Sequence, residues 1–260
     1  MIEILSDILD FSETAMMTLF LVFVRVGGIM ALMPGFGETF IPTRIRLAIT
    51  VCISVITWPL LKTGLAEQAW APLTVVGFIV AEAASGLLIG TAFRLMTAAL
   101  QVAGSIAAQS TSLAQIAGAG VVPDPMPAIG NVLLMSGLAL AMAMDLHLHV
   151  VGAVIYSYEV IPFGGFISGE VLADWGLSRI TAAFNLAFSL AAPFVIAAFV
   201  YNISLGAMNK AMPQLMVAFI GAPAITGGSL LLLLLAAPAI FSVWLGAFAS
   251  VLENPFEVPR

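Results

Sequence analysis

Apolar residues run through this chain in long segments, and polar or helix-breaking residues gather in short stretches between them. The segments are Ala15–Met33, Leu47–Leu61, Leu73–Ala108, Ala128–Tyr158, Ile180–Leu205 and Leu215–Leu252. Alternation of apolar and polar residues, which would indicate strands, persists nowhere, so the pattern predicts helices throughout. A helix needs about 20 apolar residues to cross a bilayer. We therefore expect an all-α integral membrane protein with about six apolar segments.

Several segments are longer than one crossing requires, and glycine and proline interrupt them. The last one contains Gly221, Pro223, Gly227, Gly228 and Pro238. Because these residues bend or end helices, we predict broken and bent helices that form helical hairpins. The polar stretches are predicted as a short amphipathic lead, two loops and a connection: Met1–Glu13, Pro34–Arg46, Glu159–Arg179 and Gly206–Gln214.

The region from 82 to 115 has an inverted pattern. Small or polar residues recur every three or four positions, which places them on one stripe of a helix. They are Glu82, Gly86, Gly90, Arg94, Thr97, Gln101, Gly104, Ala108, Thr111 and Gln115. Bulky apolar residues such as Leu87 and Phe93 lie on the other faces. Small residues let a second backbone come close, and polar ones need protein or water, so we expect this stripe to pack against helices or to face a channel.

One straight helix over 82–115 would be about 50 Å long, against a hydrocarbon core of about 30 Å. A cluster of helix breakers follows it: Gly118, Gly120, Pro123, Pro125 and Pro127. Irregular backbone at membrane depth is tolerated only inside protein or beside a cavity. Residues Gln109–Met126 are therefore the first candidate for a gate.

The composition supports a membrane protein with little mass outside the bilayer. Hydrophobic residues make up 62% and charged residues 8%, against about 25% charged residues in soluble domains. The formal net charge of −6 and the lack of a basic patch argue against nucleic acid as a partner. A single cysteine, Cys52, excludes an intrachain disulfide. The acidic start and Arg25 in the first apolar segment predict an uncleaved first helix.

Three ionisable residues lie inside apolar segments: Arg25, Glu82 and Arg94. Such groups are costly in a bilayer and usually face protein or water. Structural or intersubunit pairing is the favoured interpretation, and a proton relay is the alternative. Glu82 and Arg94 are about 18 Å apart along a helix, so they cannot pair with each other.

The chain offers little for catalysis or metal binding. His147 and His149 are two positions apart and face different sides of a helix, so they chelate poorly. Asp145 and the two histidines are better explained as a polar cluster at a helix end. Arg44, Arg46 and Lys210 lie beside loop prolines, where they would anchor loops or headgroups or dock to another subunit. No nucleophile, phosphate-loop or zinc-protease motif occurs, and we expect no enzyme, cofactor or metal.

Four stretches, in this order and spacing, resemble the FliR family of the flagellar type III protein export apparatus. They are ALMPGFGETFIPTRIRLAI (Ala31–Ile49), GLLIGTAFRLMTAALQVAGSIAAQ (Gly86–Gln109), DLHLHVVGAVIYSYEVIPFG (Asp145–Gly164) and LGAMNKAMPQLMVAFIGAPAITGG (Leu205–Gly228). The resemblance covers roughly residues 15–245, and the part from Met212 to Pro223 is its most diagnostic piece.

The resemblance implies a subunit of the export gate, in one domain over 1–260 with a FliP-like part (about 1–180) and a FliQ-like hairpin (about 181–260). It implies FliP-type, FliQ-type and FlhB-type partners, unfolded export substrates and membrane lipid. The implied location is the bacterial inner membrane, as a multi-pass protein of the flagellum basal body. Intersubunit contacts are expected at Arg44, Arg46, Asp145, His147, Lys210, Met212, Pro213 and Gln214.

The resemblance also places a channel plug at Gln109–Met126. Some members of that family carry phenylalanines there, whereas this chain has none between Phe93 and Phe163, so the assignment is by position. The candidate plug residues are Gln109, Leu113, Gln115, Ile116 and Met126. Two alternatives stay open: a self-contained small-molecule transporter, which broken helices also suit, and the equivalent subunit of a virulence injectisome.

Overall fold

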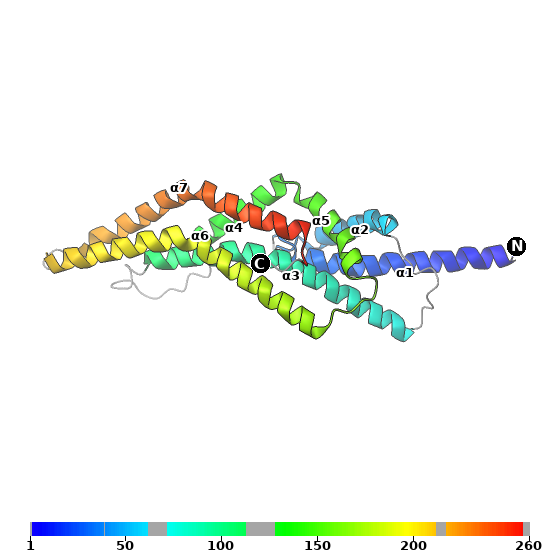
Figure 1. Ribbon diagram of the computed structural model, residues 1–260. Helices are drawn as coiled ribbons and strands as arrows, with labels where there is room; N and C mark the ends of the chain where they lie inside the picture. Colours follow the sequence, from blue (N-terminus) through cyan, green and yellow to red (C-terminus); the bar gives the residue numbers. More distant parts are fainter. Residues whose placement is uncertain (1, 39, 62–71, 113–127, 212–216, 257–260) are drawn as a thin grey trace. The chain divides into compact units, whose positions relative to one another are not determined.

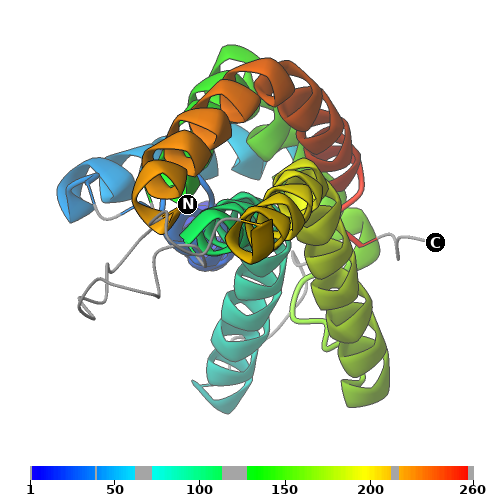
Figure 2. The ribbon, with the colours of Figure 1, turned by 90° about the vertical axis from the view of Figure 1, so that its left-hand side faces the viewer.

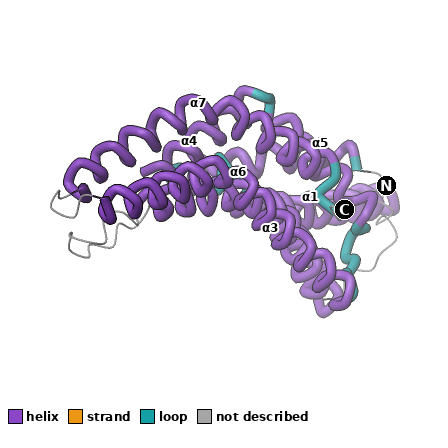
Figure 3. The backbone as a smooth tube through the Cα atoms, turned by 60° about the vertical axis from the view of Figure 1, so that its left-hand side comes forward, coloured by secondary structure: helices purple, strands orange, loops and turns teal. Residues whose placement is uncertain are grey.

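A computed structural model describes residues 2–38, 40–61, 72–112, 128–211 and 217–256 of the chain (Figure 1). Seven α-helices and one short 3-10 helix make up most of these residues. The elements are α1 (Ile2–Leu32), α2 (Thr43–Thr57), η1 (Trp58–Leu60), α3 (Pro72–Ser112), α4 (Ala128–Ala143), α5 (Leu146–Val160), α6 (Gly169–Ala211) and α7 (Val217–Glu253). Figure 3 shows only helices and short loops over these residues, without a strand. The all-α prediction is confirmed.

The prediction of about six apolar segments with breaks is also confirmed. Five described helices are long and apolar enough to cross a membrane, and there are six candidate spans if α4 and α5, bent by 76° at their break, are taken as one. The helices α3, α6 and α7 contain 41, 43 and 37 residues. At 1.5 Å per residue they are about 55–65 Å long, roughly twice the hydrocarbon thickness.

The predicted loop at Glu159–Arg179 is wrong in extent, because α6 already begins at Gly169. Ser168 ends the irregular segment. Its carbonyl accepts a hydrogen bond from the Leu172 amide at 3.0 Å, and its hydroxyl accepts one from the Val171 amide. Glu170 in the first turn favours a helix start through the helix dipole. Polar residues here form the start of a helix with an exposed face.

Other boundaries also differ from the expectation. The lead at Met1–Glu13 is continuous with the first apolar segment in α1, and α2 begins at Thr43, directly after Pro42 with its φ of −57°. The expected connection Gly206–Gln214 is helical as far as Ala211, and α7 continues through Pro238. At Gly206 and Pro238 local breakers are overridden, because a helix satisfies its backbone groups in an apolar medium.

The described residues form two compact units that alternate along the sequence. The first unit contains Met1–Arg94, Met142–Arg179 and Ala249–Arg260, and the second contains Leu95–Ala141 and Ile180–Phe248. The core of the first unit is supplied by α1, α3 and α5, including Val26, Met30, Phe93, Val150 and Val154. The core of the second unit is supplied by α3, α4, α6 and α7, including Leu100, Leu134, Phe194, Trp244 and Phe248.

Within the second unit, α6 and α7 run side by side as a hairpin (Figures 1 and 2). Residues of both helices line a cavity of about 290 Å³, from Phe194 to Tyr201 on α6 and from Ala224 to Leu235 on α7. The hairpin leaves much of its apolar surface uncovered, and this bears on the function proposed below.

The apolar side of α3 differs from the expectation. Phe93, which the pattern puts on a face turned away from the stripe, is fully buried, and so are the apolar residues Ile89 and Leu100. Leu87 is 44% exposed, as that prediction requires. In each unit, α3 therefore contributes both part of its stripe and part of its apolar surface to the interior.

Candidate functional site

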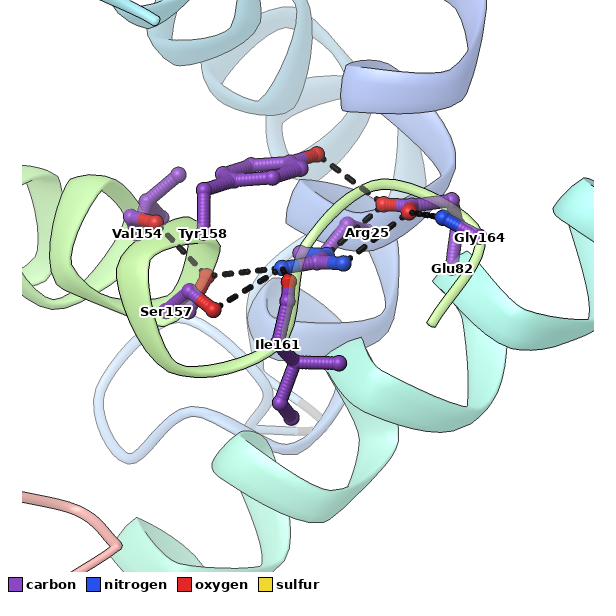
Figure 4. A network of polar contacts seen from close by, with 7 residues as sticks. All are labelled: Arg25, Glu82, Val154, Ser157, Tyr158, Ile161 and Gly164. Atoms are coloured by element: carbon purple, nitrogen blue, oxygen red, sulfur yellow. Dashed lines mark hydrogen bonds and ion pairs between the residues drawn. The ribbon is translucent and has the colours of Figure 1, made fainter. Parts of the chain in front are cut away.

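A closed polar network lies at the centre of the first unit, around Arg25 of α1 (Figure 4). The side chains of Arg25 and Glu82 are fully buried and form an ion pair. Arg25 Nε donates to Glu82 Oε2 at 2.7 Å, and Arg25 Nη2 donates to Glu82 Oε1 at 2.9 Å. This two-point contact between a guanidinium and a carboxylate is the strong form of such a pair.

The third guanidinium nitrogen of Arg25 binds the C-terminal end of α5. Nη1 donates to the carbonyl of Ile161 at 2.9 Å and to the carbonyl and hydroxyl of Ser157 at 3.2 Å each. The last carbonyls of a helix have no partner within the helix. Arg25 therefore caps α5 from a helix more than 130 residues away in sequence.

Glu82 completes the network from α3. Its carboxylate accepts a hydrogen bond from the Tyr158 hydroxyl at 3.0 Å and one from the Gly164 amide at 3.0 Å. The Tyr158 ring covers the Arg25 guanidinium, with 3.7 Å between the ring centroid and Cζ. The network joins α1, α3, α5 and the segment after α5, and it compensates both buried charges. This geometry matches the structural pairing interpretation of Arg25 and Glu82.

The glycines of the α3 stripe lie where backbones meet in the first unit. A Cβ atom at Gly86 would overlap the carbonyl oxygen of Arg25, and one at Gly90 would lie 3.0 Å from the carbonyl oxygen of Ile29. Gly28 on α1 is placed reciprocally, because its Cβ would lie 3.0 Å from the Gly86 backbone. The small residues thus bring α1 against α3 within this chain, and part of the stripe finds its partners without another subunit.

A second charged group lies on the loop between α1 and α2. Arg94 forms an ion pair with Glu38, whose side chain is almost buried. Arg46 donates to the carbonyls of Phe36 and Glu38, both at 3.0 Å. The loop also turns through Gly35, whose φ of 83° suits glycine. Two arginines therefore hold an irregular stretch of backbone.

The second unit repeats the close approach of backbones at the other end of the stripe. A Cβ at Gly104 of α3 would overlap the backbone of Gly130 on α4.

Trp244 of α7 is fully buried, stacks on Phe248 at 4.9 Å between ring centroids, and donates its indole N–H to the Met96 carbonyl at 2.8 Å. Gln101 and Ala108 on the stripe are half-buried.

Asp145 lies at the break between α4 and α5, in the left-handed region with φ 57° and ψ 39°. Its carboxylate makes no capping hydrogen bond, and its side chain is exposed. Asp and Asn adopt this conformation more readily than most residues, which gives a physical reason for a short polar residue at this bend.

The remaining candidates are exposed or lie outside the described residues. Arg44, His147, Lys210 and Gln109 are exposed on helices α2, α5, α6 and α3. Outside the described part lie Leu113, Gln115, Ile116, Met126, Met212, Pro213 and Gln214. Their roles in a plug or in subunit contacts stay predictions.

No metal centre is formed by the described residues, among which no group of three or more His, Cys, Asp or Glu could hold an ion. Three side chains of the site were missed by the sequence: Glu38, Tyr158 and Trp244. Glu38 is 56 residues from Arg94 and Trp244 is 148 residues from Met96. No spacing rule connects residues at such separations.

The fold and the network define a helical membrane protein whose buried charges tie long helices together. A family model described as "Bacterial export proteins, family 1" matches residues 16–251, and the chain belongs to this family. The resemblance to the FliR family is thereby confirmed.

Several relatives carry the name flagellar biosynthetic protein FliR. The one from Caulobacter vibrioides is 31% identical over 235 residues, which cover 90% of this chain and 93% of the relative. The one from Bacillus subtilis is 26% identical over 90% of this chain and 91% of its own length. The one from Escherichia coli is 24% identical over 77% of this chain and 76% of its own length.

Proposed function

We propose that this chain is a subunit of the flagellar type III export gate, which forms the channel for unfolded flagellar proteins together with FliP-type and FliQ-type subunits. The observation that carries the proposal is family membership over residues 16–251, with relatives named for flagellar biosynthesis along 90% of the chain. The assignment to a channel, to these partners and to an FlhB-type neighbour extends beyond what the relatives' names say.

The uncovered apolar surface of α7 supports a role in an assembly. Within Ala224–Glu253, the most apolar 18-residue window has a mean hydropathy of 2.3, yet only 11% of that window is buried within the chain. Exposed apolar residues on the α6–α7 hairpin include Phe184, Phe188, Ile196, Phe199, Leu230, Leu231, Leu234 and Leu235. Membrane lipid and the apolar faces of partner subunits are the surroundings in which such a surface is stable.

The long helices support the same proposal. At about twice the thickness of the hydrocarbon core, α3, α6 and α7 reach beyond one bilayer crossing. A gate that rises out of the plane of the bacterial inner membrane, at the flagellum basal body, accommodates this length.

We propose that Gln109–Met126 supplies a plug that closes the channel at rest and moves when an unfolded substrate engages. Its first four residues, Gln109–Ser112, form the end of α3, where Gln109 is exposed. The sequence supports a non-helical plug over the later part, because glycine and proline cluster from Gly118 to Pro125. The mechanism is gating, and it requires no catalytic residue and no cofactor.

Co-expression with FliP-type and FliQ-type subunits, followed by an ion-permeability assay, tests the proposal. The variant lacks Ala114–Gly120, and a matched control lacks the seven residues Lys62–Gln68. We expect the chain to co-purify with both partners in all three forms. Only the first deletion should make the membrane leak ions.

Each other outcome changes the proposal in a defined way. If the complex forms but the Ala114–Gly120 deletion stays tight, the plug assignment is wrong and the subunit assignment stands. If both deletions leak equally, the leak reports general damage instead of a plug. If the chain purifies alone as a stable monomer or homo-oligomer, the gate proposal fails and a transporter becomes the better explanation.

A further inference from the structure

An apolar cavity of about 390 Å³ lies in the first unit, beside the polar network. Its walls come from α3, the end of α5, the segment that joins α5 to α6, the first turns of α6 and the end of the described chain. The lining includes Ile161, Phe166, Val171, Leu172 and Phe256. All nine lining side chains are aliphatic or aromatic.

The pocket is far larger than the voids of a packed interior, few of which exceed a water molecule, and one side of it is open. At about 30 Å³ per water it would hold about a dozen waters. Water is stable in a cavity only where it finds polar partners, and this lining offers almost none. The occupant that fits is therefore an apolar group.

The cavity is open to the surface of the first unit. Two of its lining residues, Phe166 and Val171, are 69% and 58% exposed, whereas Ile161 is 3% exposed. The lining thus grades from buried to exposed, so a side chain from another molecule can enter without unfolding the wall.

The charges beside the cavity are mainly negative. The exposed residues Glu159, Glu170 and Asp174 each precede a lining residue directly in sequence. Arg179 is the described cation on this side: it lies 6.0 Å from the Trp175 ring centroid and donates to the carbonyls of Asn254 and Pro255. Three carboxylates and one guanidinium leave a negative excess, which favours an occupant with positive charge next to its apolar group.

The polar network fixes one wall of the cavity. Arg25 binds the Ile161 carbonyl and Glu82 binds the Gly164 amide, so both ends of the turn after α5 are held. The turn leads directly to Phe166. A preformed wall lowers the ordering cost of binding, which suits a contact that forms during assembly.

We propose that this cavity receives an apolar side chain, flanked by lysine or arginine, from another subunit of the export gate. The inference rests on the proposed function, because it takes the partner from the same assembly. It adds a place on this chain and the chemistry of the contact: an apolar anchor in the cavity and basic residues beside Glu159, Glu170 and Asp174.

Site-specific photo-cross-linking in the co-expressed complex tests the inference. A benzoylphenylalanine replaces Val171 at the cavity, and a matched control replaces Leu177, which is 67% exposed on the same helix but does not line the cavity. We expect the Val171 product to map to a partner-subunit peptide with an apolar residue within a few positions of lysine or arginine. The Leu177 product should not contain that peptide.

Two further changes test the cavity and the charges separately. Leu172→Trp fills the space and should abolish the Val171 product, while the subunits still co-purify. Glu170→Lys and Asp174→Lys should each lower the yield of the Val171 product several-fold. The yield with Glu170→Gln should lie between that of the lysine variants and that of the unchanged protein.

Co-purification in the same samples separates this inference from the proposed function. Loss of all partners would contradict the function itself. Intact co-purification without a partner product would overturn the inference alone, and so would a Val171 product with lipid, with detergent or with residues 257–260 of this chain. A partner product that neither Leu172→Trp nor Glu170→Lys changes would also overturn it.

Discussion

Different interactions stabilise the interior of each of the two units of this chain. The first unit contains a buried ion pair, Arg25 with Glu82, and a second pair, Arg94 with Glu38. In the described part of the second unit, buried contacts are mostly apolar, and Trp244 supplies a buried polar link between α7 and α3.

The difference follows from where the backbone is irregular. Every described residue of the second unit is helical, whereas the first unit includes the loop before α2 and the segment between α5 and α6. The charged side chains of the first unit bind peptide groups of those segments: Arg46 at Phe36 and Glu38, Arg25 at Ile161, and Glu82 at Gly164. In an apolar protein, irregular backbone needs such partners because water does not supply them.

Breaking the Arg25–Glu82 pair should give the largest effect. Arg25→Met leaves the Glu82 carboxylate buried without its guanidinium, and we expect a loss of about 3–5 kcal/mol in the free energy of unfolding. Denaturant titration of the purified complex in detergent measures it. The double variant Arg25→Met, Glu82→Met removes both charges and should be more stable than the sum of the single changes predicts.

The exposed residue Arg44 provides the control for that experiment. Arg44→Met should change the stability by no more than about 0.5 kcal/mol. If the double variant loses the full sum of the single losses, the two residues do not act as a pair and the first half of the comparison is wrong.

Gly86→Ala should give the next largest effect. Its Cβ overlaps the Arg25 carbonyl oxygen, so α1 and α3 must separate, and overpacking of this kind costs about 1–3 kcal/mol. Gly77→Ala on the same helix meets nothing within 4 Å and should gain up to about 1 kcal/mol from helix propensity. Thermal unfolding of both variants gives the contrast, and equal melting temperatures would contradict a close helix contact at Gly86.

Trp244→Phe tests the second unit. The change removes the hydrogen bond to the Met96 carbonyl, which is worth about 1 kcal/mol net, and it leaves a void beside Gly137. We expect a loss of about 1–2 kcal/mol, below that of Arg25→Met, in the same denaturant titration. The control Trp58→Phe alters a half-buried tryptophan, and a loss at Trp244 no larger than at Trp58 would show that the indole link is dispensable.

The sequence predicted the helical fold and about six apolar segments because hydropathy records the medium that surrounds each segment. It misplaced the start of α6 because Glu159–Arg179 was judged by polarity instead of by capping. Ser168 and Glu170 carry the cap signal that would have corrected it. The expectation that Pro238 would break the last apolar segment was wrong, because a helix packed in a membrane protein tolerates proline better than a local rule implies.

For the candidate site, the sequence identified the groups but not their partners. The three-and-four spacing found Glu82, Gly86 and Gly104, since periodicity is local. The partners Arg25 and Glu82 are 57 residues apart, and Arg94 and Glu38 are 56 apart. Only the packing of helices decides which of several buried charges meet, so these ion pairs could not be predicted from the sequence.

The smallest expected effect concerns Asp145, at the bend between α4 and α5 in the first unit. Its left-handed backbone costs most residues about 1–2 kcal/mol, and Asp tolerates it better. Asp145→Gly should therefore be neutral or slightly stabilising, and Asp145→Asn should be neutral. Asp145→Ala should lose about 1 kcal/mol in thermal unfolding of the complex, whereas the control His147→Ala, exposed in the first turn of α5, should change little. If alanine and glycine at 145 behave alike, backbone strain does not select this residue, and its charge is then the property to test with Asp145→Asn in the same assay.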